Sequence, residues 1–187
     1  MSPRTRITKE EILRTAMDLV RKKGGDALNA RDLAAALNCS TQPIFSNYAT
    51  MGLLWHAVLE SAYELYQSYI RKEQESGEFP PYKASGMAYI RFAQEEKELF
   101  KLMFLSDRGG APIPEDDVVM VQAHKAVQHN IGLDPERAKL FHLEMWVYVH
   151  GIATMFATGY LDLPWELVSQ MMTDMYQGLR KRFGMEA

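Results

Sequence analysis

The sequence predicts an all-α protein of about nine helices, three short ones at the N-terminus followed by six mostly longer ones. Apolar residues recur at helical spacing along almost all of the 187-residue chain, and no segment shows the strict alternation of a strand. Short stretches rich in glycine and proline, such as "DRGGAPIP" and "GLDP", separate the helical segments. With 47% hydrophobic residues, the chain can bury a substantial core.

Composition also limits where the protein works. Nothing at the N-terminus resembles a signal peptide, and no apolar run approaches the roughly 20 residues that cross a bilayer. We therefore expect a soluble, cytoplasmic protein that does not enter membranes. The single cysteine, Cys39, excludes an internal disulfide framework and a multi-cysteine zinc site. Its expected role is that of a small, buried side chain in a turn rather than a redox sensor.

The first two helices carry their own start and stop signals. Thr8 and Glu11 have the spacing of a capping box, and Gly24-Gly25 closes the helix that follows. Asn29 can cap a second helix, "ARDLAAAL". Both helices have one apolar face, so each is expected to pack against a neighbour.

A proline marks the start of the third helix, in "NCSTQPIFSNYA". If Ser40 is the N-cap, Pro43 falls in the first turn, where a missing backbone N–H costs little. Two short helices joined by a tight turn suggest a helix-turn-helix. We assign residues 1–50 to this helix-turn-helix domain.

Residues 51–187 are assigned to a second, larger helical domain. Its longest helix is predicted over about 51–76, with an apolar stripe formed by Leu54, Val58, Ala62, Leu65 and Tyr69. Breaker-rich segments divide the rest into helices at about 82–95, 97–105, 115–131, 135–160 and 164–183.

Charge is distributed unevenly between the two domains. Residues 1–50 contain eight lysine and arginine residues against five acids, a formal charge of +3, whereas the whole chain carries −3 and the remainder therefore −6. A basic end on an acidic body is typical of a module that binds a polyanion, although surface charge often segregates without a purpose.

The third helix has the side chains that read bases. Major-groove readout needs short or planar polar side chains near a helix N-terminus, and Thr41, Gln42, Ser46 and Asn47 provide them. The ring of Pro43 could lie against a thymine methyl group. The alternative is an ordinary polar helix face, and we expect Ile44 and Phe45 to pack in the core rather than touch DNA.

Three arginines are placed for phosphate contacts. Arg31 begins the second helix, and Arg4 and Arg6 belong to an N-terminal arm. These contacts would position the protein on double-stranded DNA without reading its sequence.

The segment "ITKEEILRTAMDLVRKKGGDALNARDLAAALNCSTQPIFSNYATMGLLWHAVLE" resembles the DNA-binding region of the TetR family of bacterial transcriptional regulators. The resemblance comprises the rhythm of Ala16, Leu19 and Gly24, then "RDLA", Ser40 and an aromatic pair, Phe45 and Tyr48. We add Tyr48 to the candidate DNA contacts.

The second domain is similar to a subgroup of that family through "YIRFAQEEKELFKLMF" and a Trp-x-x-x-His-Gly signature formed by Trp146, His150 and Gly151. The resemblance implies an all-α homodimer that reads a palindromic operator, and a body that often binds a small molecule that releases the DNA. No cofactor is implied.

Two positions depart from the family pattern. Met51 stands where a phosphate-contacting lysine is usual, so one backbone anchor is missing. Asn38 replaces the usual glycine of the turn, and asparagine tolerates a left-handed backbone better than most residues.

The histidines do not predict a metal site. His142, Trp146 and His150 recur every four residues on one helix face, but residues eight apart lie about 12 Å apart along a helix axis. The two imidazoles cannot share one ion unaided, and His124 and His129 match no better. Packing of His150 beside Gly151 is the favoured interpretation, and we predict no metal.

Soft and aromatic side chains in the second domain suggest an effector cavity for a largely apolar small molecule. A solid core is the alternative, because the same side chains fill cores. The candidate ligand residues are Tyr66, Phe92, Met103, Phe104, Met120, His124, Trp146, His150 and Met155.

The last two helices are the expected dimer interface. In "PWELVSQMMTDMYQGLRKRF", Val168, Met171, Met172, Met175, Leu179 and Phe183 form one stripe, and Trp165, Leu167 and Tyr176 lie partly off it. The helix thus has more apolar surface than one packing partner needs, and an isologous four-helix interface would bury the excess.

Two other functions stay open from the residues alone. One is a helical enzyme or small-molecule carrier of similar shape, although "HLEMWVYVHG" offers no evident nucleophile partner. The other is an architectural DNA-binding protein without an effector. A ligand-responsive repressor is the preferred hypothesis.

Overall fold

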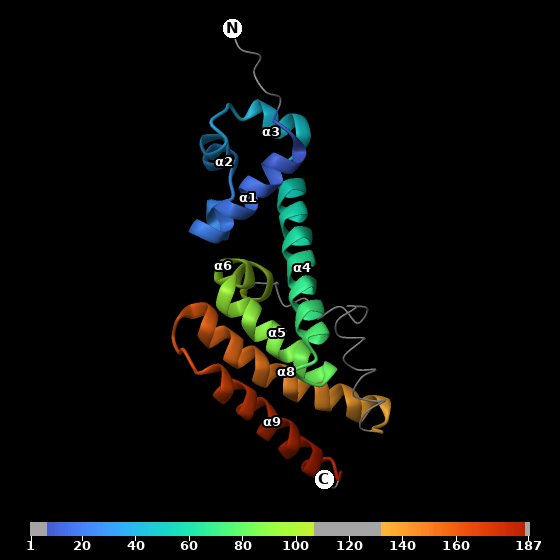
Figure 1. Cartoon of the computed structure of the whole chain (residues 1–187). Coiled ribbons are helices and arrows are strands. Elements are labelled where there is room, and N and C mark those ends of the chain that lie inside the picture. The colour runs from blue at the N-terminus through green and yellow to red at the C-terminus, as the bar shows by residue number, and fades with distance from the viewer. Residues whose placement is uncertain (1–6, 107–131, 186–187) are drawn as a thin grey trace. The chain divides into compact units, whose positions relative to one another are not determined.

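A computed structural model describes residues 7–106 and 132–185, and these residues form helices joined by turns, with no strand among them (Figure 1). This confirms the predicted all-α fold. Among the described residues, no helix is both long enough and apolar enough to span a bilayer. The elements are α1 Lys9–Lys23, η1 Gly25–Ala27, α2 Ala30–Ala36, α3 Gln42–Asn47, α4 Met51–Ser76, α5 Pro81–Glu95, α6 Lys97–Phe100, η2 Lys101–Leu105, α8 Pro135–Thr158 and α9 Trp165–Arg182.

The described residues belong to two compact units. One lies within Met1–Gln67 and Glu96–Ser106, and the other within Ser68–Glu95 and Asp107–Ala187. We call them the N-terminal unit and the body. The N-terminal unit holds α1–α3, the first part of α4, and α6 with η2. The functional boundary after residue 50 stays a prediction. The helix predicted at 115–131 lies outside the described residues.

Helix α1 begins and ends where the sequence predicts. The Glu11 backbone N–H donates to Thr8 Oγ1 at 3.1 Å, and the Thr8 N–H donates to Glu11 Oε2 at 2.9 Å. Gly24 ends the helix with φ +83°, a conformation that side chains oppose. Ile12, Ala16 and the other apolar residues at helical spacing are buried, so α1 provides the core face of the N-terminal unit.

The helix-turn-helix follows the predicted pattern, with one shift. The Asp32 N–H donates to Asn29 Oδ1 at 3.0 Å and caps α2, and Asn38 adopts φ +51° in the turn, as predicted. The N-cap of α3 is Thr41, not Ser40. The reason is that the Thr41 carbonyl accepts the first helical bonds, from the backbone N–H groups of the third and fourth residues after it. Pro43 still lies in the first turn.

Helix α4 has the predicted bounds, but its buried face turns along its length. Leu54, Val58 and Ala62 are fully buried, as predicted, and Tyr66 and Ile70 continue the series in place of Leu65 and Tyr69. A step of four residues exceeds the helical repeat of about 3.6, so the buried stripe drifts around the axis. As a result, the two ends of α4 bury different faces, the first in the N-terminal unit and the second in the body.

The body is built on α5, α8 and α9, which lie side by side (Figure 1). Gly86 allows α5 to approach the other two closely, because a Cβ there would lie 2.5 Å from Met172 Cε and 3.7 Å from Val149 Cγ2. The Arg91 guanidinium lies 4.1 Å from the Trp165 ring centroid and 3.2 Å from a Glu73 carboxylate oxygen. Apolar packing at Gly86 and the contact of Arg91 with Trp165 thus hold α5 against α8 and α9, and the partly buried ion pair with Glu73 connects α5 to α4.

The helix predicted over 97–105 exists as a continuous segment with a change of winding. Its first turn, α6, is α-helical, and residues 101–105 form a π-helical turn, η2. The Ser106 hydroxyl donates to the Leu102 carbonyl at 2.7 Å and ends the turn. Apolar spacing alone could not predict this change, because a single π-helical turn is too short to show a period of its own in the sequence.

The left-handed backbone at Asn38 leads to a prediction about the turn. Asn38→Val should lower the free energy of unfolding by about 1–2 kcal/mol, because a β-branched side chain clashes at positive φ. Asn38→Gly, the matched control, should change it far less. Chemical denaturation monitored by circular dichroism measures both. Equal destabilisation by the two substitutions would show that the asparagine side chain, not the backbone conformation, matters at this position.

Candidate nucleic-acid interface

Helix α3 is oriented by two anchors. Ile44 is fully buried and Tyr48, one helical turn later, is 4% exposed. The Lys9 ammonium lies 5.0 Å from the centroid of the Tyr48 ring, so α1 also covers this anchor. With these two side chains turned inward, Thr41 and Gln42 are exposed at the start of the helix.

Two of the predicted base-reading side chains bind their own helix. The Ser46 hydroxyl donates to the Gln42 carbonyl at 2.9 Å, and the Asn47 amide donates to the Pro43 carbonyl at 2.8 Å. Ser46 is exposed and Asn47 is half-buried. The bond to Pro43 fixes the orientation of the Asn47 amide but leaves its carbonyl oxygen and a second N–H for a base edge.

The predicted phosphate contacts can be placed only in part. Arg31 is exposed in the first turn of α2. Arg4 and Arg6 lie outside the described residues. The Thr50 hydroxyl accepts a hydrogen bond from the Leu53 N–H at 3.2 Å and caps the start of α4, where Met51 is half-buried.

Three sequence expectations on this unit differ from the structure. Phe45 was expected in the core but is 44% exposed. Because Ile44 and Tyr48 occupy the inward face, the residue after Ile44 points about 100° away from it. Cys39 is partly exposed rather than buried. Tyr48, a candidate DNA contact, is instead an anchor of the core.

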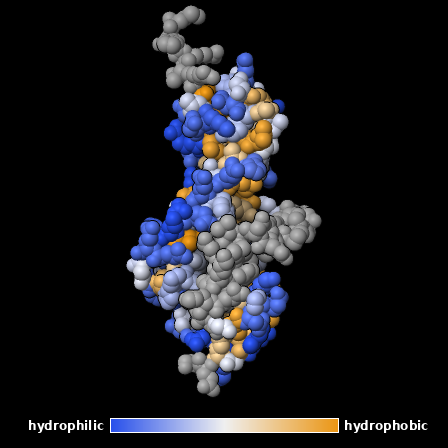
Figure 2. All heavy atoms as spheres, turned by 90° about the vertical axis from the view of Figure 1, so that its right-hand side faces the viewer, coloured by the Kyte–Doolittle hydropathy of each residue, from blue (hydrophilic) through white to orange (hydrophobic). Residues whose placement is uncertain are grey.

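Sequence reasoning therefore missed Phe45 as a surface residue next to the polar ones. The sequence contained the pattern that predicts this exposure. Ile44 and Tyr48 are four residues apart and so share the inward side of this short helix, which leaves Phe45 off that side. Figure 2 shows apolar surface among hydrophilic side chains on the face of this unit that it displays. An exposed phenylalanine can contact a thymine methyl group or a sugar.

The candidate effector residues fall into the two units. In the N-terminal unit, the rings of Tyr66 and Phe104 meet edge to face at 5.7 Å, and Met103 is half-buried. In the body, Phe92 is fully buried and Met155 is 38% exposed. Met120 and His124 lie outside the described residues.

The histidines of the body are bound by tyrosines. His150 Nδ1 lies 2.9 Å from the Tyr89 hydroxyl, and the imidazole stacks on Trp146 with ring centroids 4.9 Å apart. His142 Nδ1 lies 2.9 Å from the Tyr82 hydroxyl. Burial lowers the pKa of His150, so its imidazole is neutral at pH 7. Among the described residues, no group of three or more His, Cys, Asp or Glu side chains could hold a metal ion.

A small helix-turn-helix unit joined to a larger helical body defines the class of helical DNA-binding regulators. Residues 82–176 match the family model described as "Tetracyclin repressor-like, C-terminal domain", which covers about half of the chain. The chain therefore belongs to the TetR-like family of transcriptional regulators. This assignment favours a regulator over the helical enzyme or carrier. The Trp-x-x-x-His-Gly subgroup stays a prediction.

The fold agrees with that of a solved relative. The crystal structure of a TetR-like transcriptional regulator from Rhodococcus sp. RHA1 matches with a TM-score of 0.70 and 12% sequence identity, over 98% of this chain and 100% of that chain. At this identity the match concerns the fold alone. No curated protein matches the sequence.

Proposed function

We propose that this protein is a repressor that binds a palindromic operator as a homodimer and is released by a small, largely apolar effector. The observation that carries the DNA-binding part is the outward face of α3, where Gln42 and Ser46 are exposed while Ile44 and Tyr48 anchor the helix. A short helix with a fixed inward side presents its polar side chains in a defined register to the major groove.

Gln42 is the residue best suited to test base reading. It is exposed, and its planar amide can bond adenine at two positions. Asn47 offers the same chemistry, but its bond to the Pro43 carbonyl means that a substitution would change helix stability as well. Arg31 carries a charge on the first turn of α2 and would hold a phosphate.

Gln42→Ala should therefore weaken binding to the cognate operator by about 1–3 kcal/mol while leaving binding to random DNA nearly unchanged. Arg31→Ala should weaken binding to all DNA sequences alike and reduce the slope of log affinity against log salt concentration by about one. Fluorescence anisotropy with DNA flanking the protein's own gene, at several salt concentrations, measures both. Lys72→Ala, an exposed cation on α4 in the body, is the control for charge. Equal loss on operator and random DNA after Gln42→Ala would contradict base reading.

Support for the homodimer comes from the outer face of α8. Leu143 and Val147 are 45% and 57% exposed, and Leu140 is 44% exposed on the same stripe. Gly151 continues it, and a Cβ there would meet nothing within 4 Å. On α9 and at its C-cap, Phe183, four residues of the predicted stripe are buried within the chain, Val168, Met172, Leu179 and Phe183, while Leu167 is 44% exposed. Exposed apolar side chains and a bare glycine at helical spacing suit the close packing of a second copy.

Val147→Glu combined with Leu143→Glu should convert the dimer to a monomer, because two carboxylates would have to be buried in the interface. Both positions are exposed within the chain, so the monomer should keep its fold. Light scattering coupled to size exclusion at micromolar concentration gives the mass, with Lys72→Glu as the surface control. A wild-type protein that is monomeric under these conditions would contradict the dimer and the palindromic operator with it.

The effector part of the proposal is supported by the side chains of the body. Trp146 is half-buried on α8 and lies flat on His150, which Tyr89 holds in place. An aromatic surface with a few oriented polar atoms is the chemistry of sites for apolar ligands. A ligand releases DNA only if it prefers the DNA-incompetent state.

Trp146→Ala distinguishes a ligand site from a solid core. In a ligand site the substitution should abolish enhancement of Nile red fluorescence while operator affinity stays within about twofold and stability changes little. In a solid core it should cost roughly 3–5 kcal/mol of unfolding free energy. Trp165→Ala, on α9 beside Arg91, is the matched control. Strong destabilisation together with no dye binding to the wild type would contradict an effector site at Trp146.

A further inference from the structure

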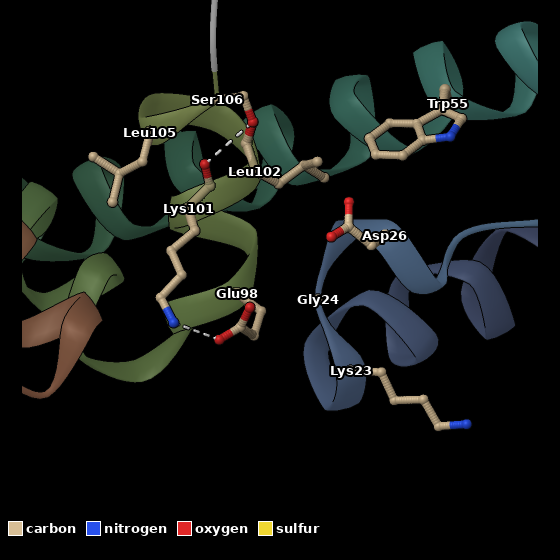
Figure 3. Close-up of a pocket in the computed structure, with 10 residues that line it drawn as sticks. Lys23, Gly24, Asp26, Trp55, Glu98, Lys101, Leu102, Leu105 and Ser106 are labelled. Atoms are coloured by element: carbon tan, nitrogen blue, oxygen red, sulfur yellow. Dashed lines mark hydrogen bonds and ion pairs between the residues drawn. The ribbon is translucent and has the colours of Figure 1, made fainter.

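The N-terminal unit contains a pocket of about 470 Å³ that the proposed function does not use (Figure 3). Its walls are the end of α1 with the start of η1, the indole of Trp55 on α4, and the segment α6–η2. All three belong to the same unit as the helix-turn-helix. The pocket is therefore separate from the effector residues of the body.

Two glycines keep one wall of this pocket bare. A Cβ on Gly24 would lie 3.1 Å from Glu98 Oε2, and a Cβ on Gly25 would lie 3.0 Å from Leu102 Cδ1 and 3.2 Å from Trp55. Each distance is tighter than an ordinary van der Waals contact. The wall consequently presents peptide groups, with no side chain between them and the groups opposite.

The opposite wall is stabilised from outside the pocket. Arg21 binds Glu96 through two bonds, from Nε at 2.8 Å and Nη2 at 3.1 Å, and so ties α1 to the start of α6. The π-helical winding of η2 then follows, a rare conformation that occurs frequently at functional sites. Leu102 and Leu105 come from this turn and, with Trp55, form the apolar part of the lining.

The polar part of the lining has two acids and two lysines. Asp26 and Glu98 contribute carboxylates, and the C-terminal end of α1 adds the negative end of a helix dipole. Lys23 extends away from α6 in Figure 3. Lys101 faces Glu98 and binds it at 2.7 Å, so these two charges compensate each other, and Asp26 is the acid of the lining outside this ion pair.

We propose that this pocket binds a small organic cation, an amine that carries an apolar or aromatic group. The ammonium of the ligand would bond Asp26 and replace the Lys101 ammonium at Glu98. The apolar part of the ligand would lie on Trp55, whose ring face also attracts a nearby cation. An anion would meet the Asp26 carboxylate and the negative end of the α1 dipole. The site does not depend on the proposed repressor function, because binding can be measured without DNA.

The test uses two probes of similar shape and opposite charge, phenethylamine and phenylpropionate. Binding is monitored by NMR through the amide and indole N–H signals of the full chain. The chain has three tryptophans, and Trp55→Phe identifies the Trp55 indole signal. Phenethylamine should shift that signal and the amides of Gly24 and Gly25 in a saturable way. Phenylpropionate should shift none of them at the same concentration.

Substitutions of the two acids complete the test. Asp26→Asn and Glu98→Gln should each lower the affinity for phenethylamine by about tenfold, because each removes a charged hydrogen-bond partner. Glu10→Gln, an exposed acid in the first turn of α1, should change nothing. Asp26 is exposed, so Asp26→Asn keeps the test decisive if Glu98→Gln disturbs folding. Shifts at Trp146 or Trp165 in place of Trp55, equal binding of the two probes, or wild-type affinity in Asp26→Asn would each overturn the proposal.

Discussion

The inward anchoring of α3 is the constraint on which the proposed DNA-binding face depends. A helix of six residues is far too short to be stable alone in water, so its existence and its direction come from burial of Ile44 and Tyr48. These two side chains are one turn apart, and together they fix rotation about the helix axis. The turn at Asn38 fixes the direction in which the chain approaches α3. These contacts determine where each exposed polar residue of α3 lies.

The N-terminal unit extends beyond the helix-turn-helix for a related reason. Three short helices bury little apolar surface, and small domains of this size are marginally stable. Here α1 also packs against α6, with the Arg21–Glu96 pair on one side and the bare backbone of Gly24 and Gly25 on the other. A side-chain hydrogen bond to Glu96 raises the pKa of Arg21, so the guanidinium keeps its charge. A segment from the middle of the sequence thus completes the core begun at the N-terminus.

Local signals in the sequence predicted local structure well. The capping box at Thr8, the cap at Asn29 and the left-handed turn at Asn38 depend on residues within four positions of each other, and all three are present. The errors arose where the outcome depends on long-range packing or on backbone detail. The buried stripe of α4 moves to Tyr66 because its neighbours change along the helix, and the exposure of Phe45 follows from which side of α3 meets α1. Roles in ligand binding or dimerisation depend on molecules outside the chain, so residue type alone could suggest them but not decide them.

The junction between α5 and α6 shows what a conformational switch in this protein would require. Consecutive residues there bind within different units, since Glu95 accepts a hydrogen bond from Tyr69 at 2.8 Å in the body and Glu96 binds Arg21 in the N-terminal unit. Exposed ion pairs contribute about 0–1 kcal/mol. Moving a population from 99:1 to 1:99 takes about 5.5 kcal/mol of differential binding. The polar contacts at this junction are therefore too weak to hold one state against the other. A single aromatic pair, such as Tyr66 with Phe104, adds only about 0.5–1.5 kcal/mol beyond the area it buries. An effector would therefore have to supply the difference through several contacts that it makes in one state and not in the other.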